Sequence, residues 1–171
     1  MRAARILGGA FGALVGVLAA AYLAGAIQPT AEGRPGMKLA GELVREPVSD
    51  WGFSDADELV ELESRAPWGL AHSVTVVCAS TGAELYVPSV YREGGGWPEA
   101  RRWNRNVVAD PDVRIRIGGK IYERRAVLVT DEAERSAAFA AFAAKYDAWA
   151  TWHAAPPNER PEIAFVRLDP R

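Results

Sequence analysis

The feature that most constrains the fold is the stretch 101–119, which reads RRWNRNVVADPDVRIRIGG. Apolar residues recur at helical spacing over 102–109, and Pro111 ends the helix because it lacks the backbone N–H that a further turn needs. Apolar and charged residues then alternate over 112–117, which is the period of a strand with one solvated face. The pair Gly118-Gly119 supplies a two-residue hairpin turn. The stretch therefore predicts a helix, then a strand, then a hairpin.

Further strands are expected where alternating or β-branched runs are bounded by turn residues, at 59–64, 73–79, 85–91, 120–130 and 163–168. The run 73–79 is almost wholly apolar, as is typical of a central strand. Pro88 places its strand near an edge or a bulge. A helix is predicted over 132–144, where Asp131 and Glu134 form a capping box. The expected class is α+β: a small barrel of about six mostly antiparallel strands with two or three helices against it.

An uncharged apolar run from Ile6 to Ile27 precedes this domain. As a helix it exceeds the hydrocarbon thickness of roughly 30 Å, so it predicts one N-terminal transmembrane helix. The small residues 24–26 keep a cleaved signal peptide as the alternative. Arg2 and Arg5 hold the N-terminus on the cytosolic side. The expected location is therefore the inner membrane, single-pass, with the globular domain outside the cytosol.

The run also suggests how the chain is divided and how it pairs. We expect an anchor or signal peptide over 1–27, a linker over 28–50, where Pro, Gly and charge mix without a period, and a folded domain over 51–171. Glycines recur every four residues in the run and would let a second helix approach for a homodimer, at Gly8, Gly12 and Gly16. An alanine- and glycine-rich composition explains the same glycines without a dimer.

Charge and cysteine content exclude several classes of function. Without Arg2 and Arg5 the chain keeps 18 Lys and Arg against 22 Asp and Glu, a net charge of −4, so nucleic acid is not an expected partner. The lone Cys78 has no disulfide partner and is expected to be a small buried hydrophobe. No metal-ligand cluster, carboxylate pair or Ser-His-Asp arrangement stands out, so hydrolase chemistry has no support.

The order of elements resembles the deazaflavin-dependent nitroreductase family, a branch of the split β-barrel flavin-binding proteins. The resemblance rests on W-x-x-N-x-x-x-x-P, a strand, a Gly-Gly hairpin and a Tyr-bearing strand, which here are Trp103, Asn106, Pro111, Gly118, Gly119 and Tyr122. It covers about 60–168. The resemblance implies a split β-barrel whose groove binds FMN or a deazaflavin and passes a hydride to a quinone or nitro compound.

Members of such a family hold the cofactor's phosphates with a basic, glycine-containing loop after the first strand. The matching loop, 65–73, reads RAPWGLAHS and has one firm cation. Helix arginines would supply further charge, and FMN, with a single phosphate, needs less than a longer deazaflavin tail. The candidate cofactor-binding residues are Arg65, His72, Ser73, Ser89, Arg102, Trp103, Arg105 and Asn106. No catalytic residue is assigned.

Each main candidate also has a purely structural interpretation. Trp103 is expected to close the barrel end as a core residue. Asn106 is expected to cap backbone groups where the helix ends. The helix arginines are equally explained by surface ion pairs with nearby acidic residues, Glu93, Glu99 and Asp110. His72 is an ordinary polar residue at a strand start as much as a general acid.

Two functions therefore follow from the sequence. The first is a membrane-tethered flavin- or deazaflavin-binding oxidoreductase that acts on a quinone or nitro-type acceptor, with the cofactor supplying the chemistry. The second is a split-barrel domain without a cofactor that serves as a binding or structural module at the membrane, because a fold alone does not license an activity.

Overall fold

The computed structural model describes the backbone of residues 2–91 and 95–171 and the side chains of residues 13–91 and 95–171. Within this part the chain forms eight strands, which are β1 Glu42–Val44, β2 Val60–Arg65, β3 Ala71–Val76, β4 Ala79–Ser80, β5 Leu85–Tyr91, β6 Asp112–Ile117, β7 Lys120–Leu128 and β8 Glu162–Pro170. The helices are α1 Arg2–Leu23, α2 Arg102–Ala109, α3 Glu132–Lys145 and α4 Asp147–Ala154, with 3-10 turns η1 Gly52–Ala56 and η2 Pro157–Glu159. The class is α+β, as the sequence predicts.

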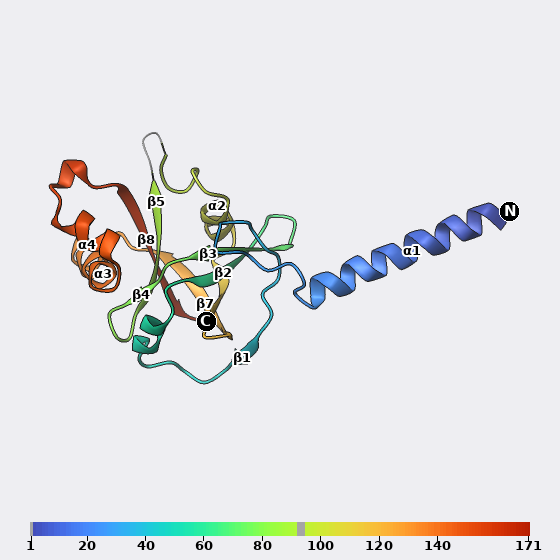
Figure 1. The fold of residues 1–171 in the computed structure, drawn as a ribbon, viewed down its shortest axis with the longest axis horizontal. Helices are drawn as coiled ribbons and strands as arrows, with labels where there is room; N and C mark the ends of the chain where they lie inside the picture. Colours follow the sequence, from blue (N-terminus) through green and yellow to red (C-terminus); the bar gives the residue numbers. More distant parts are fainter. Residues whose placement is uncertain (1, 92–94) are drawn as a thin grey trace.

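All eight strands belong to one sheet that curls into a split barrel (Figure 1). Seven of them follow the order β3-β2-β6-β7-β8-β5-β4 with antiparallel pairing, and β1 adds to β7 in parallel. The two ends of this order, β3 and β4, are separated in the chain by Val77 and Cys78 alone. One continuous segment therefore contributes the strands at both ends of the sheet. Because these two strands are close in the chain, the sheet must curve so that its ends approach each other.

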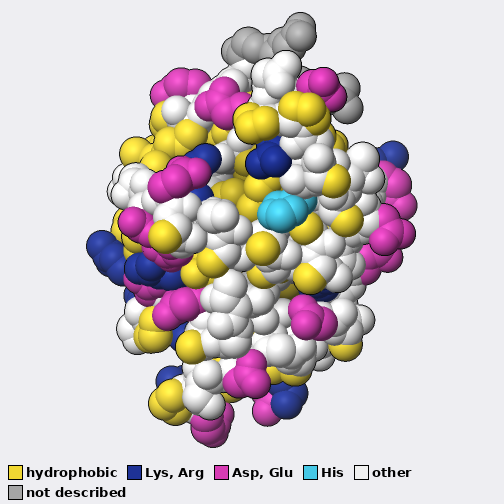
Figure 2. Space-filling model, turned by 90° about the vertical axis from the view of Figure 1, so that its left-hand side faces the viewer, with side chains coloured by type: hydrophobic (Ala, Val, Ile, Leu, Met, Phe, Trp, Pro, Cys, Tyr) yellow, Lys and Arg dark blue, Asp and Glu magenta, His cyan; other side chains and the backbone are white. Residues whose placement is uncertain are grey.

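Two hydrophobic clusters fill the space inside and outside this barrel. The interior cluster comes from inward positions of the strands and from two tryptophans at its ends, and includes Trp51, Val60, Leu62, Cys78, Val87, Trp103, Ile115 and Val166. The exterior cluster lies where α3 and α4 cover β5 and β8, and its Phe142 ring stacks on Trp149 at 4.5 Å. Figure 2 shows the outer face of these helices, where charged side chains of both signs are scattered among hydrophobic ones.

The stretch 101–119 folds as its pattern predicts. Residues 102–109 are α2, and β6 buries Val113, Ile115 and Ile117 while the residues between them stay half-exposed. Gly118 and Gly119 have φ angles of 56° and 78°, the left-handed conformation that a two-residue hairpin requires of both residues. This hairpin fixes the register of β6 against β7 over six residue pairs.

The predicted start of α3 is confirmed, although only half of the capping box forms. The Asp131 carboxylate accepts a hydrogen bond from the Glu134 backbone N–H at 2.8 Å. The Glu134 carboxylate does not return to residue 131. It accepts from Arg167 Nη1 at 2.7 Å and from the Tyr86 hydroxyl at 3.3 Å instead. An ion pair to the sheet has therefore replaced the local bond.

The prediction of a central strand over 73–79 is wrong. This segment forms β3 and β4, which lie at opposite ends of the sheet. The outer edge of β3 is covered by the N-terminal segment, since Gly36 and Ser73 exchange two backbone hydrogen bonds at 2.8 and 3.0 Å. An apolar run alone does not distinguish a strand between two others from an edge strand that another segment covers.

Helix α1 projects away from the barrel (Figure 1) and ends at Leu23, short of the predicted Ile27. Gly25, at a φ of 65°, turns the chain just after it. Among the residues that the structure describes, no helix is long and apolar enough to span a bilayer, so the predicted transmembrane helix is not supported. For the proposed helix-pairing positions Gly8 and Gly12 the structure describes the backbone alone, so their surroundings lie outside the described part.

The segment 28–50, predicted as a linker, lies against the barrel. Its strand β1 pairs with the start of β7, with Glu42 opposite Lys120 and Val44 opposite Tyr122. Two short strands, β1 and the two-residue β4, explain why the sheet has eight strands where six were expected. Neither shows a hydrophobic period, because a strand of two or three residues is too short to display one.

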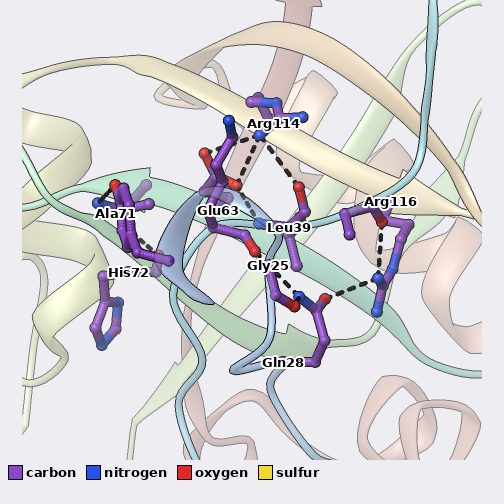
Figure 3. A network of polar contacts seen from close by, with 12 residues as sticks. Gly25, Gln28, Leu39, Glu63, Ala71, His72, Arg114 and Arg116 are labelled. Carbon is purple, nitrogen blue, oxygen red and sulfur yellow. Dashed lines mark hydrogen bonds and ion pairs between the residues drawn. The ribbon is translucent and has the colours of Figure 1, made fainter. Parts of the chain in front are cut away.

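Two half-buried ion pairs fasten the same segment to the outer face of β2 and β6 (Figure 3). Arg114 Nη1 lies 3.0 Å from Glu63 Oε2, and that carboxylate accepts from the Leu39 backbone N–H at 2.6 Å. Arg116, itself paired with a β2 carboxylate, donates to Gln28 Oε1 at 2.8 Å. The charged face of β6 is therefore a docking surface for the N-terminal segment, whereas the sequence predicted that it would face water.

Candidate functional site

The barrel is open between β3 and β5. β4 pairs only with Leu85 and Tyr86, so the described part of the chain places no strand against the rest of that edge of β5. On the facing edge of β3, the described pairing consists of the single bridge at Ser73. Beyond Ser73 on β3 and beyond Tyr86 on β5, the backbone groups of these two edges have no strand partner among the described residues.

This opening forms a cavity of about 280 Å³, which we call the split groove. It is lined by Gly33, Val74, Thr75, Val76, Val77, Pro88, Val90, Arg101 and Trp103. Trp103 belongs to the core and packs edge-to-face on Trp97, with ring centres 6.1 Å apart. The core interpretation of Trp103 is thus confirmed, and the same residue also lines the groove.

Two arginines begin α2 at the end of the split groove. Arg101 Nη2 donates to the Val90 carbonyl on the open edge of β5 at 2.8 Å. The Arg102 guanidinium lies over the Trp68 ring, 5.0 Å from its centre. Within the described residues neither arginine is paired with a carboxylate. Both therefore keep a positive charge available for an anionic group at this end of the barrel.

The other two candidate arginines are engaged in ion pairs. Arg65 Nε lies 3.5 Å from Asp110 Oδ2. Arg105 Nη1 donates to the Glu99 carbonyl at 2.7 Å and lies 4.0 Å from the carboxylate of the same residue. The pair of Arg105 with Glu99 is one that the surface interpretation expected, whereas Asp110, expected to pair with a helix arginine, contacts Arg65 instead. Glu93, the third expected acidic partner, lies outside the described residues.

Two buried asparagines fasten α2 to strands β5 and β2. Asn104 Nδ2 donates to Ser89 Oγ at 3.0 Å and to the Tyr91 hydroxyl at 2.8 Å, both on β5. Asn106 Nδ2 donates to Ser64 Oγ on β2 at 3.0 Å. Asn106 therefore does not cap the helix end with its side chain, as the sequence predicted, but bonds across to a strand.

The sequence predicted that His72 and Ser73 belong to one cofactor site, but the structure places their side chains on opposite faces of β3. His72 lies opposite Ser64 in the β2–β3 ladder and is buried on the same face. Ser73 points to the other face, beneath the N-terminal segment at Gly36, because successive strand residues alternate. His72 Nδ1 and Ser73 Oγ are both buried, and neither has a hydrogen-bond partner in the described part of the chain.

The environment of His72 holds it neutral. Burial lowers the pKa of this imidazole, and the nearby positive charge of Arg102 lowers it further. On its strand face His72 is followed by Val74, which lines the split groove. A neutral histidine and an exposed arginine therefore lie together beside the groove.

A second cavity, of about 490 Å³, lies on the outer face near Arg65. Its charged lining residues are Lys38, Glu63, Arg65, Asp112, Arg114, Glu123 and Arg171. Most of these cations already contact carboxylates, as in the pair of Arg114 with Glu63 at 3.0 Å. This charge balance makes the cavity a weaker site for an anion than the start of α2, where Arg101 and Arg102 have no carboxylate partner among the described residues.

Sequence reasoning missed one residue of the site, Asn104. It treated Arg101 as one of the helix arginines that could supply charge to a phosphate, and Tyr91 as a half-buried strand residue without its contact to α2. Asn104 is fully buried, and its Oδ1 has no partner within the described residues. No local signal marked it, because residues adjacent on a helix lie on different sides and the buried Trp103 does not predict the burial of its neighbour.

Fold and opening together define a split β-barrel protein with an apolar groove flanked by arginines. The chain belongs to the F420H(2)-dependent quinone reductase family, whose model matches residues 69–155. The match runs from β3 to α4 and includes Trp103, Asn106 and the Gly118-Gly119 hairpin. The resemblance drawn from the sequence is therefore confirmed.

Solved structures with low sequence identity share the fold. HutZ, the heme storage protein from Vibrio cholerae, is 13% identical with a TM-score of 0.51, over 70% of this chain and 85% of that one. ChuZ from Campylobacter jejuni is 12% identical with a TM-score of 0.52, over 70% and 50%. A conserved hypothetical protein from Mycobacterium tuberculosis is 14% identical with a TM-score of 0.50, over 70% and 76%. A search of curated proteins finds no match.

Proposed function

We propose that this protein is an oxidoreductase that holds a deazaflavin in the split groove and reduces a quinone. The observation that carries the proposal is the apolar groove beside Arg101 and Arg102, in a chain of the F420H(2)-dependent quinone reductase family. A ring system needs a flat apolar slot, and its phosphate tail needs cations near the slot's end. Both requirements meet at the start of α2.

The dimensions of the groove fit the ring rather than the whole cofactor. Ligand pockets typically measure about 300–1,000 Å³, and the split groove, at about 280 Å³, lies just below that range. A planar ring would occupy it against Val74, Val76 and Trp103. The anionic tail would continue along the exposed start of α2 toward Arg102.

The chain's own groups would bind the ring, orient it and exclude water. Open-edge backbone groups of β3 and β5 supply hydrogen bonds of fixed direction for a heterocycle. Trp103 is locked by packing against Trp97, so it supports the ring without rearranging. The bound cofactor supplies the hydride, and the protein supplies position and a dry surface.

Two alternatives to deazaflavin binding are FMN binding and a module without a cofactor, and the titration below distinguishes them. FMN carries one phosphate and needs fewer donors, and a cofactor-free module needs none. The observation that favours the module is the loop 66–71, which has no cation, while the adjacent Arg65 is paired with Asp110.

Direct titration of the full chain tests the function. A deazaflavin and FMN are added separately, and quenching of protein fluorescence is followed, because Trp103 lines the groove. We expect saturable binding of the deazaflavin at micromolar concentration, followed by quinone reduction when the reduced cofactor is supplied. Tighter binding of FMN would replace the cofactor in the proposal. Absence of binding by both would leave the module.

The location of the protein and its pairing stay predictions from the sequence. We propose single-pass attachment to the inner membrane with the barrel outside the cytosol, supported by the uncharged run 6–27 after Arg2 and Arg5. Fusion of a reporter that is active only outside the cytosol to the C-terminus decides the side. A silent fusion would reject that orientation, and cross-linking of Gly12→Cys chains would test the homodimer.

A further inference from the structure

A second pocket lies where two strands share one edge of β7. β6 occupies the other edge as far as Arg125. β1 pairs with Lys120–Tyr122, and β8 takes over the same edge at Arg124, which leaves Glu123 between them. A cavity of about 500 Å³ opens between the end of β1 and the end of β8, and we call it the junction pocket. It shares no lining residue with the split groove.

Arg124 lines this pocket and is buried without a polar partner. Arg124 is 8% exposed, and the described part of the chain provides no hydrogen bond or ion pair to its guanidinium. Its guanidinium lies over the Trp51 ring, 4.6 Å from the centre. That ring is fixed by edge-to-face packing on Tyr122, with centres 5.1 Å apart. The guanidinium therefore has one stable contact, through its face, and its Nε is buried without a hydrogen-bond partner in the described part of the chain.

Such an arrangement is costly unless an anion completes it. A buried charge that lacks hydrogen bonds loses its hydration without compensation, and burial lowers the pKa of the Arg124 guanidinium. The half-buried arginines of the β6 face are each paired, because Arg114 and Arg116 each have a carboxylate within 3.0 Å. Arg124 differs from them in having none among the described residues.

The other charged residues that line the pocket are Arg45, Glu46, Glu123 and Arg171, and none of them makes a hydrogen bond or ion pair with Arg124 in the described part of the chain. The Glu46 carboxylate accepts a hydrogen bond from the Arg45 backbone N–H at 3.2 Å. Arg171 Nη2 is paired with Asp112 at 3.1 Å. Arg45 is exposed at the rim and adds positive charge at the entrance of the junction pocket. The pocket thus has a charged rim and a buried cation at its base.

We propose that the junction pocket binds a small oxyanion, a carboxylate or phosphate group, on the Arg124 guanidinium. The planar fork of arginine matches two oxygens of such a group, and Trp51 holds the fork in place. Binding at this position couples the ligand to stability, because the anion satisfies a charge that folding has buried.

The test uses the full chain with potassium phosphate or potassium acetate, each against potassium chloride at equal ionic strength. Thermal unfolding and Trp51 fluorescence are the readouts. We expect at least one oxyanion to raise the unfolding midpoint at millimolar concentration where chloride does not. Arg124→Met, which keeps the side-chain volume, should weaken that binding by roughly ten- to a hundredfold, as loss of one charge-assisted contact does. In chloride alone it should melt no lower than the parent.

Three matched variants keep the outcome decisive. Arg125→Gln removes the next arginine, whose exposed side chain is paired with Asp112 at 3.5 Å, and should leave the oxyanion response unchanged. Arg45→Gln should weaken binding by roughly two- to fivefold, as an exposed charge does. If the parent shows no oxyanion response, and Glu46→Gln lowers the midpoint in chloride and creates a response, Glu46 is the solution partner of Arg124 and the proposal is overturned. Equal responses of the parent and Arg124→Met would overturn it as well.

Discussion

The two ends of the barrel use the same residue types in opposite ways. Near α2, Arg102 lies over the exposed Trp68 ring, and its charge is in contact with water. At the η1 end, Arg124 lies over the buried Trp51 ring and has no polar partner among the described residues. An exposed cation can bind or lose an anion with little effect on folding, whereas a buried one links the anion to stability.

The tryptophans of the two ends differ in burial in the same way. Trp51, which lies under Arg124, is a core residue, and so is Trp103 near α2. Trp68, which lies under Arg102, is 64% exposed on a loop. A tryptophan that fills the core is tied to the stability of the whole sheet. A tryptophan on a loop serves only the group that stacks on it. Four substitutions test this division between structure and binding.

The largest effect is expected from Trp103→Ala. Removing a buried tryptophan typically lowers the free energy of unfolding by about 3–5 kcal/mol, because a cavity replaces its contacts. Trp68→Ala is the matched control and should change it by less than about 0.5 kcal/mol, as a surface substitution does. Urea unfolding measures both. Equal losses would show that Trp68 is part of the core in solution.

A smaller effect, on binding rather than folding, is expected from Arg102→Gln. One charge-assisted bond to a phosphate contributes about 1.5–3 kcal/mol, so deazaflavin affinity should fall by roughly ten- to a hundredfold with unchanged stability. Arg105→Gln is the matched control on the same helix, and its ion pair with Glu99 predicts little change in affinity. Fluorescence titration compares them. A larger loss with Arg105→Gln would move the phosphate site to the position that the sequence first suggested.

Asn106→Ala should destabilise the α2 end without touching an arginine. It leaves Ser64 Oγ without its buried donor, and an unsatisfied buried group costs about 1–3 kcal/mol. A double-mutant cycle with Ser64→Ala isolates the pair, and we expect a coupling of about 1 kcal/mol. Additive losses would show that Asn106 acts by packing alone.

The smallest effect is a pH dependence through His72. Its pKa is lowered by burial and by Arg102, so below about pH 6.5 the unfolded state binds more protons than the folded state. The free energy of unfolding should therefore rise with pH through this window and level off above it. His72→Gln should flatten the curve, and His153→Asn should not. A curve that is unchanged in His72→Gln would exclude His72 as its source.

Local pattern was sufficient for much of the fold. The boundaries of α2 and β5, the alternation of β6 and the hairpin at Gly118-Gly119 all follow from neighbours in sequence, because period and turn geometry are local properties. The β4 strand and the edge position of β3 do not follow. They depend on which distant segment pairs with each edge, and a short apolar run does not encode that choice.

The sequence by itself determined the class of fold, the core role of Trp103 and the family, since each depends on residue type at fixed spacing. Only the tertiary structure decided which arginines are free. Arg65 and Arg105 form ion pairs with surface carboxylates. Arg101 and Arg102 have no carboxylate partner among the described residues. Arg124 is buried because of its position on β7. The sequence shows which side chains are charged, but the partner and the burial of each charged side chain depend on distant segments that folding brings together.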